Sequence, residues 1–186
     1  MTHLLLLFLL AAPLPAPTAA GEAFVTYAGF TLGTASLADV QNRFGPSPLF
    51  HVGDAGDSEW SVCYASVPNN LTVRFLSGEL GGPEHTLLGF QLLSVASKGG
   101  ATCPPSTAPP QLAFPRDLAG AALGMSRSSF AALLNTPLPA GAGPISQSFC
   151  GTRLINGTTF DRCIFVTGQF VNGRLTGLTV TLTETN

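Results

Sequence analysis

The chain has 186 residues, with eight basic and ten acidic side chains and a formal net charge of −2. This near-balance gives no electrostatic reason to bind nucleic acid or an anionic membrane surface, so we expect neither as a partner. An apolar content of 45% excludes a disordered chain, and 21 glycines with 15 prolines favour a protein rich in strands and loops.

Residues 1–20 have the pattern of a cleaved secretory signal. The apolar run from Leu4 to Ala12 is too short to span a bilayer. Thr18-Ala19-Ala20 then offers the small residues that signal peptidase requires. No cysteine lies near the cleavage site, so we expect no membrane anchor. The sequence therefore predicts a periplasmic or secreted protein.

Two stretches of the remaining chain resemble each other. The hexapeptide Ala28–Gly33 returns at Ala119–Gly124, 91 positions later, and further matches follow downstream at nearly the same offset. A match sustained over this length indicates a duplicated structural unit. We predict repeat one at 21–96, a Pro- and Gly-rich linker at 97–115, and repeat two at 116–186.

Each repeat is predicted to begin with one short helix. Ser36-Leu37-Ala38-Asp39 has the spacing of a capping box, and Gly45-Pro46 ends the helix that follows. In the second repeat Ser126 begins the helix and Pro137 follows it. Helices this short are unstable alone, so we expect both to pack on a sheet.

Three antiparallel strands follow each helix in the prediction. They are Glu59–Ser66, Leu71–Ser77 and Thr86–Ser94 in repeat one, and Ser146–Ile155, Thr158–Val171 and Arg174–Thr183 in repeat two. The Asn172-Gly173 turn predicts that Phe165 faces Val180, on an apolar face turned to the helix, and that Gly168 faces Gly177. Opposed glycines indicate the close approach of another element. The predicted fold class is therefore α+β: two tandem repeats, each a short helix packed on a three-stranded meander.

The four cysteines of an exported chain are expected to pair. Asn156-Gly157 is a strong signal for a two-residue hairpin turn, and counting back from it places Cys150 opposite Cys163. This is a non-hydrogen-bonded position, where the Cα atoms approach closely enough for a disulfide. We therefore predict Cys150–Cys163, which leaves Cys63–Cys103. Free buried thiols are the alternative.

One polar and aromatic cluster is a candidate partner-binding site, formed by Phe50, His51, Asp54, Asp57, Glu59 and Trp60. Its aromatic members are suitable anchors for a protein partner, although a Trp near Cys63 is as readily a buried core residue. Its acidic members offer oxygens to calcium, but a solvated loop explains them better because the full ligand loop of an EF-hand is missing. The segments His51–Glu59 and Leu138–Pro144 differ most between the repeats, so specific binding is expected there.

No combination of residues predicts catalysis. Beyond the signal only His51 and His85 remain, both in predicted loops. The sequence contains no nucleophile elbow, phosphate-binding loop or His-Glu-x-x-His motif. We therefore assign no catalytic residue, metal ligand or cofactor, and expect a protein that is not an enzyme.

Gly124-Met125-Ser126, followed by Phe130, Leu134 and Pro137, resembles a signature of small envelope domains of the BamE (SmpA/OmlA) and β-lactamase-inhibitor-protein type. Gly33–Pro46 is a looser second copy. Tandem copies, a signal peptide and an intra-repeat disulfide are similar to the inhibitor proteins in particular. The resemblance implies an envelope location and protein binding, and it carries over no inhibitory residue.

Three functions remain open at this point. The first is a non-catalytic periplasmic or secreted module that binds a protein of unknown identity through its sheet face and variable loops. The second is a secreted inhibitor of a hydrolase such as a β-lactamase. The third, and the most remote, is a small hydrolase centred on His51.

Overall fold

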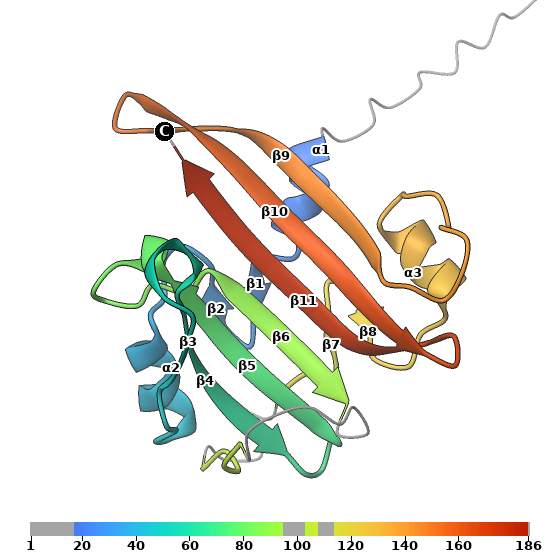
Figure 1. Cartoon of the computed structure of the whole chain (residues 1–186), viewed down its shortest axis with the longest axis horizontal. Coiled ribbons are helices and arrows are strands. Elements are labelled where there is room, and N and C mark those ends of the chain that lie inside the picture. The colour runs from blue at the N-terminus through green and yellow to red at the C-terminus, as the bar shows by residue number, and fades with distance from the viewer. Residues whose placement is uncertain (1–16, 95–102, 108–113, 186) are drawn as a thin grey trace, which may run out of the picture.

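A single antiparallel sheet of seven strands dominates the structure, a computed structural model that describes residues 17–94, 103–107 and 114–185 (Figure 1). The strand order is β3-β4-β5-β6-β11-β10-β9. These strands are β3 (Phe50–Val52), β4 (Glu59–Ser66), β5 (Leu71–Gly78), β6 (Gly89–Ser94), β9 (Ile145–Ile155), β10 (Thr158–Val171) and β11 (Arg174–Thr185). Two meanders, β4-β5-β6 and β9-β10-β11, therefore join through their last strands.

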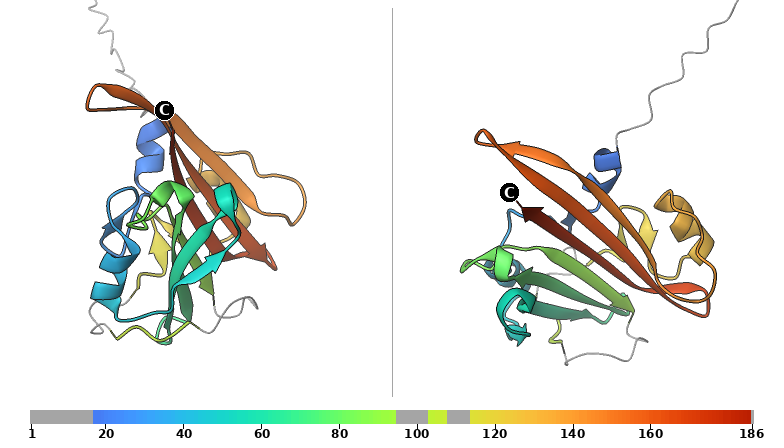
Figure 2. Two further views of the ribbon diagram at one scale, coloured as in Figure 1. Left: turned by 60° about the vertical axis from the view of Figure 1, so that its left-hand side comes forward. Right: turned by 45° about the horizontal axis from the view of Figure 1, so that its top comes forward.

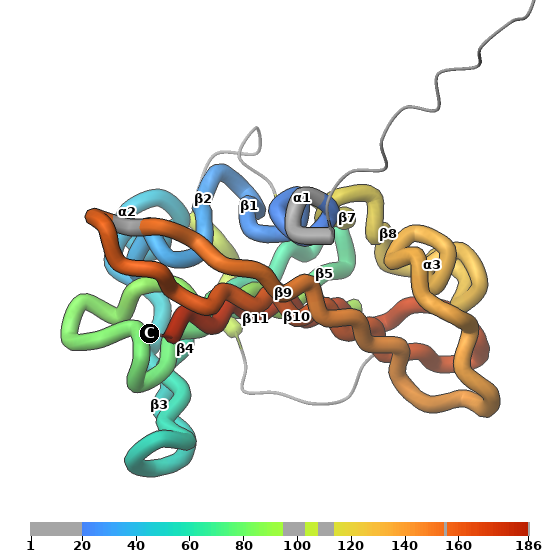
Figure 3. Tube along the Cα trace, turned by 90° about the horizontal axis from the view of Figure 1, so that it is seen from above, coloured from blue at the N-terminus to red at the C-terminus, as the bar shows by residue number. Residues whose placement is uncertain are grey.

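A second layer of helices and short hairpins covers one face of this sheet, as Figure 3 shows along the sheet and Figure 2 from two other directions. Its members are α1 (Pro17–Glu22), β1 (Thr26–Tyr27), β2 (Phe30–Thr31), α2 (Leu37–Phe44), β7 (Asp117–Leu118), β8 (Ala121–Ala122) and α3 (Arg127–Leu133). Two 3-10 turns connect neighbouring strands: η1 (Ala55–Asp57) joins β3 to β4, and η2 (Glu79–Gly81) joins β5 to β6.

The predicted α+β class, with a helix packed on a meander in each of two repeats, is wrong. The protein is mostly β, because its described residues hold eleven strands and only three α-helices, of six, eight and seven residues. All six predicted strands belong to one sheet, and the hairpins β1–β2 and β7–β8 share the covering layer with the helices. Pairing β6 with β11 removes an exposed edge from each meander, which is the physical reason for one continuous sheet.

The repeated hexapeptide forms the same turn at both places. Ala28-Gly29 closes the β1–β2 hairpin with φ values of 50° and 84°, and Ala119-Gly120 closes the β7–β8 hairpin with 53° and 84°. Both positions of each turn thus lie in the left-handed region that a type I′ turn requires, which explains the glycine. Gly33 and Gly124 then each donate a 2.8 Å backbone hydrogen bond to a downstream leucine carbonyl.

Helices α2 and α3 begin at the predicted serines, Ser36 and Ser126. The Ser36 hydroxyl accepts from the Asp39 amide at 3.2 Å, and the Asp39 carboxylate accepts from the Ser36 amide at 2.8 Å, which completes a capping box. Ser126 caps α3 by accepting from the Ser129 amide at 3.1 Å. Helix α3 has no carboxylate that accepts from the Ser126 amide, so it makes only one of the two capping-box hydrogen bonds found in α2.

Both predicted disulfides are present. Cys150 faces Cys163 across β9 and β10 with a Cα–Cα distance of 4.1 Å. Cys63 of β4 is bonded to Cys103, 40 residues further along the chain. The turn rule gave the correct β9–β10 register because no bulge interrupts that ladder. Two disulfides fit an oxidising, exported compartment.

The predicted β10–β11 register is wrong beyond the first two pairs. Phe170 faces Leu175 as predicted, but Gln169 faces Gly177, so Thr176 has no partner on β10 and forms a bulge. Val166 instead of Phe165 therefore faces Val180 and enters the core. Gly168 faces Leu178 instead of Gly177. The expected close approach at Gly168 is nevertheless present, because a Cβ there would lie 2.6 Å from the Phe130 ring of α3.

Part of the predicted linker packs into the protein. Phe114 is 1% exposed, and its ring centroid lies 4.3 Å from that of Phe44. The Pro104 carbonyl accepts a 2.8 Å hydrogen bond from the Ala65 amide of β4. The other linker positions, 97–102 and 108–113, and the first sixteen residues of the predicted signal lie outside the described residues.

Candidate functional site

One face of the seven-stranded sheet carries little of the described chain (Figure 3). The exception is at β4, where Cys63 points to this side, is 1% exposed and is bonded to Cys103. Side chains alternate along each strand, so Val73, Val166 and Val180 enter the core with 0% exposure while their neighbours point to the other side. We call this other side the open face. Its partly or fully exposed side chains are Arg74, Gln91, Leu93, Cys163, Phe165, Thr167, Thr179, Thr181 and Thr183.

The open face is rich in hydroxyl groups and nearly free of charge. Two cross-strand contacts order it: Gln91 Nε2 donates to Thr179 Oγ1 at 3.4 Å, and the Ser146 and Thr167 hydroxyls lie 2.9 Å apart. Phe165 is 41% exposed among them. Exposed aromatic rings amid neutral polar groups are typical of protein-binding surfaces.

Two loops project from the sheet on the side of the open face, one near each end of the molecule (Figure 3). The first is the flap, residues Phe50–Trp60, which comprises β3, η1 and the start of β4. The second is the α3–β9 loop, residues Leu138–Pro144, all of which are exposed. Together they flank the open face.

Stacked rings hold the flap. His51 lies opposite Trp60 in the β3–β4 pair, and the two rings are nearly parallel with centroids 4.0 Å apart. The His85 ring lies 4.9 Å from Trp60. His51 Nε2 is also 2.9 Å from the Ser58 hydroxyl. Gly53 allows the tight turn, because its φ is 83° and a Cβ would lie 2.3 Å from the Asp57 carbonyl oxygen.

Arg127 of α3 holds the α3–β9 loop. Its guanidinium donates to the carbonyls of Gly143 and Pro139, the second at 3.5 Å. The same group lies 5.0 Å from the centroid of the Phe170 ring, a cation–π contact. Sequence reasoning missed this role, since no spacing rule connects a residue in the first turn of a helix with a loop that follows it.

The structure does not bring the six predicted partner-binding residues into one cluster. Alternation along β3 and β4 places Phe50 and Glu59 on the side of the open face, where Glu59 lies 3.6 Å from Arg74. His51 and Trp60 point to the opposite side. Asp54 and Asp57 are exposed at the tip of the flap.

Within the described ranges, no group of three or more His, Cys, Asp or Glu side chains converges as a metal site. His51 and Ser58 have the separation of a base and a nucleophile, but no described carboxylate hydrogen-bonds to the other ring nitrogen of His51. The buried Ser77 Oγ and His85 Nδ1 have no hydrogen-bond partner among the described groups. The flap therefore offers two parts of a hydrolytic triad, without the orienting acid.

Comparison of the chain with protein-family models, with curated proteins and with solved structures finds no match. Among the described residues there is no helix of the length and apolar character needed to cross a bilayer. The class that the geometry defines is thus a disulfide-bonded, mostly β protein with one covered and one open sheet face.

Proposed function

We propose that this chain is a non-catalytic, exported protein-binding module whose open face holds a partner protein between the flap and the α3–β9 loop. The single observation that carries the proposal is a broad sheet face, bordered by two anchored loops, that the described segments leave largely uncovered beyond Cys63 of β4. Its weakly charged, hydroxyl-rich surface with exposed Phe165 is suited to protein contact. The predicted signal and the two disulfides support export.

A photo-crosslinking experiment tests where the partner binds. Benzoylphenylalanine is placed at Phe165 on the open face, or at Val67, an 80% exposed residue of the β4–β5 turn, as the matched control. We expect a cross-link to one reproducible envelope or secreted protein from position 165 only. Cross-links from neither position, or equally from both, would contradict binding through the open face.

Affinity measurements with the captured protein then quantify the contact. Thr179→Arg places a long charged side chain in the middle of the open face and should weaken binding at least tenfold, because it blocks close approach of the partner. Val67→Arg should leave the affinity within about twofold. Equal affinities for the two variants would contradict the proposed surface.

A secreted hydrolase inhibitor is the narrower form of the same proposal, since two loops that flank the open face are available to contact an enzyme. It predicts tight inhibition of one hydrolase, with β-lactamases tested first, and loss of inhibition when His51–Trp60 is replaced by a Gly/Ser linker. The remote hydrolase reading predicts activity that disappears in His51→Ala while the fold is retained. A broad substrate panel without turnover would eliminate it.

A further inference from the structure

The β9 strand ends the sheet, and no described segment pairs with its outer edge. The 4.1 Å Cα–Cα distance between Cys150 and Cys163 identifies a non-hydrogen-bonded pair. Alternation along the ladder then means that Ser148, Cys150 and Thr152 direct their amide and carbonyl groups away from β10. Among the described residues these groups make one hydrogen bond, from Gln147 Nε2 to the Ser148 carbonyl at 3.0 Å.

At the opposite end of the sheet the long strand β4 is covered along its outer side, and only the three-residue β3 lies outermost. β3 pairs with the first three residues of β4, and the Ser47 hydroxyl bonds to both the amide and the carbonyl of Cys63, at 3.2 and 2.9 Å. Pro104 satisfies the amide of Ala65. An unsealed edge elsewhere in the same sheet is a template for strand addition. The backbone groups on the outer side of β4 thus have partners, whereas those on the outer side of β9 are available to an added strand.

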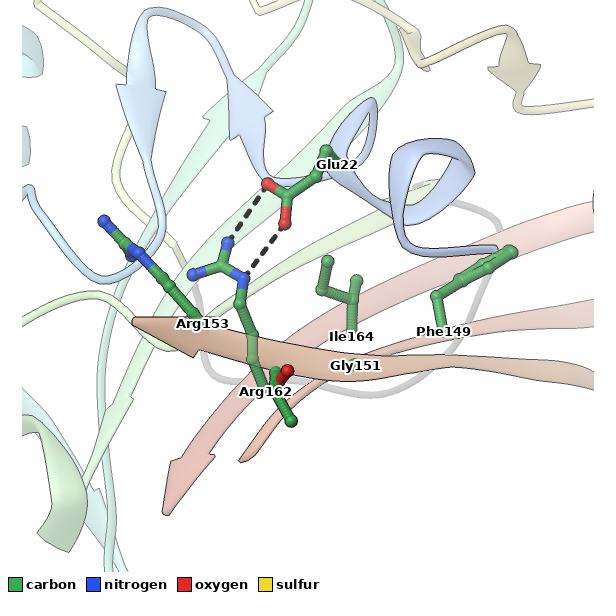
Figure 4. Close-up of a pocket in the computed structure, with 7 residues that line it drawn as sticks. Glu22, Phe149, Gly151, Arg153, Arg162 and Ile164 are labelled. Atoms are coloured by element: carbon green, nitrogen blue, oxygen red, sulfur yellow. Dashed lines mark hydrogen bonds and ion pairs between the residues drawn. The ribbon is translucent and has the colours of Figure 1, made fainter. Parts of the chain in front are cut away.

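A pocket of about 280 Å³ opens beside the free edge, on the face of the sheet opposite the open face (Figure 4). Phe149, Gly151 and Arg153 of β9 border it, and Ile164 of β10 adds to its apolar lining. The space exists because Gly151 has no side chain between Phe149 and Arg153. A strand added next to β9 would direct its own alternate side chains over this hollow.

The charges in the pocket are unequally neutralised. Arg162 has only 10% of its side chain exposed, and it donates to both Glu22 carboxylate oxygens at 3.0 and 3.2 Å as well as to Glu184 at 2.5 Å. Arg162 is therefore fully engaged in joining α1 to the sheet. Arg153 is 51% exposed and has one contact, to Glu184 at 3.4 Å. The other guanidinium nitrogens of Arg153 have no partner among the described residues and are available to a ligand.

We propose that the β9 edge binds an extended segment of a partner protein as an eighth strand. The segment places an aromatic or long aliphatic side chain in the pocket opposite Gly151, and a carboxylate two residues away beside Arg153. Backbone hydrogen bonds to Cys150 and Thr152 supply affinity, and the pocket supplies specificity. This site is separate from the open face and does not depend on the proposed function.

Charge complementarity selects this occupant over a second copy of the chain. Arg153 is the one charged residue of β9, so a β9–β9 pair would bring no carboxylate to either copy of Arg153. A partner segment with an acidic residue at that position binds the guanidinium nitrogens of Arg153 that Glu184 does not contact. An aromatic side chain next to an edge glycine also covers backbone that is otherwise exposed.

A peptide selection with the full chain tests the proposal. Phage displaying random twelve-residue peptides are selected on the oxidised protein, and the best sequence is synthesised with a fluorophore for polarisation titrations. We expect enrichment of an aromatic or long aliphatic residue two positions from Asp or Glu. Thr152→Pro removes an outward amide and adds a ring at the edge, whereas Thr152→Ala keeps the amide and is its matched control.

Thr152→Pro should weaken the synthetic peptide at least tenfold, and Thr152→Ala less than twofold. Gly151→Val fills the pocket with a residue that favours strands, and should also weaken binding at least tenfold. Hydrogen exchange of the unmodified protein adds a readout that needs no variant: the amides of Ser148, Cys150 and Thr152 should become protected on peptide addition, while that of Thr179 should not change.

Three outcomes would overturn the proposal. One is enrichment of no peptide, or of peptides that bind Thr152→Pro and Gly151→Val as tightly as the unchanged protein. Another is a peptide displaced by Thr179→Arg, which would locate binding on the open face and leave the proposed function intact. The third is a dimer in sedimentation velocity that Thr152→Pro dissociates, which would make a second copy the occupant of the edge.

Discussion

The two meanders of the sheet have similar strands but opposite edges. In the first, β4 is closed off by β3, Ser47 and the segment that Cys103 tethers. In the second, β9 presents eleven residues along an edge without such a seal. The two disulfides differ in the same way. Cys63–Cys103 fastens a distant segment to the β4 edge, whereas Cys150–Cys163 lies within the β9–β10 hairpin. A sealed edge adds stability, whereas an open edge preserves the capacity to bind a strand.

The cores beneath the two meanders also differ. Under β4–β6, Phe75 contacts the rings of Phe44 and Phe90, and Tyr64 and Phe114 belong to the same aromatic cluster. Under β9–β11 the buried residues are chiefly aliphatic: Ile145, Ile164, Val166, Leu175, Leu178, Val180 and Leu182. The sealed half is thus the more aromatic one, and we expect it to be the more resistant to local opening.

The largest expected effect comes from removing one disulfide at a time. Replacing Cys63 and Cys103 by Ser should lower the free energy of unfolding by about 4 kcal/mol, and replacing Cys150 and Cys163 by about 3 kcal/mol. The difference arises because the first bond spans 40 residues and the second 13, so the first restricts the unfolded chain more. Guanidinium unfolding of the two double variants measures both values. A larger loss from the hairpin bond would reverse the comparison.

Gly78 and Gly168 stand 90 positions apart, at matching places in the two sequence repeats, and they provide the second contrast. In Gly168→Ala the new methyl would lie 2.6 and 2.8 Å from the buried Phe130 ring and 2.9 Å from Leu175, and we expect a loss of about 2 kcal/mol. In Gly78→Ala the single close neighbour is the Ser58 carbonyl oxygen at 3.1 Å, in the exposed flap, and the loss should stay below about 1 kcal/mol. Urea unfolding measures both. Equal losses would show that α3 does not press on the sheet.

The smallest effect concerns the two helix caps and their response to acid. Removing the hydroxyl in Ser36→Ala or Ser126→Ala should cost about 1 kcal/mol at pH 7. Hydrogen bonds from the Ser36 amide and hydroxyl hold the pKa of Asp39 below its usual value. A lowered pKa contributes stability above the unfolded value near 4 and loses it as the pH falls through the folded value.

The penalty of Ser36→Ala should therefore shrink between pH 5 and pH 3, because Asp39 becomes protonated and the reciprocal bond weakens. The penalty of Ser126→Ala should stay constant, since Ser129 occupies the matching position in α3 and does not titrate in this range. Thermal unfolding at both pH values compares the two variants. A constant penalty for Ser36→Ala would show that the Asp39 carboxylate contributes nothing to the cap.

The sequence predicted local features better than distant ones. Asn156-Gly157 fixed the β9–β10 register and its disulfide, and Ser36 and Ser126 marked the helix starts, because each follows from a few neighbouring residues. The bulge at Thr176 was missed, although Gly177 beside it was a usable signal. The error placed Phe165 in the core and hid the open face.

Pairings between distant residues had no sequence signal. The pairing of β6 with β11 decides the fold class, because it joins the two meanders into one sheet. That pairing depends on which strand edges remain free after each meander has formed. The same holds for the burial of Arg162, which depends on Glu22 from α1 lying over it. The six predicted partner-binding residues were adjacent in the chain but divided by strand alternation.

The position of β11 affects how the protein must be made. It is the last strand in chain order, yet it lies in the interior of the sheet between β6 and β10. During synthesis or translocation β6 stays unpaired on this side until β11 emerges, so the sheet closes late. Truncation of β11 into residues 177–181, which pair with β6, should then separate the two meanders, whereas a similar loss at an edge strand would leave the rest paired.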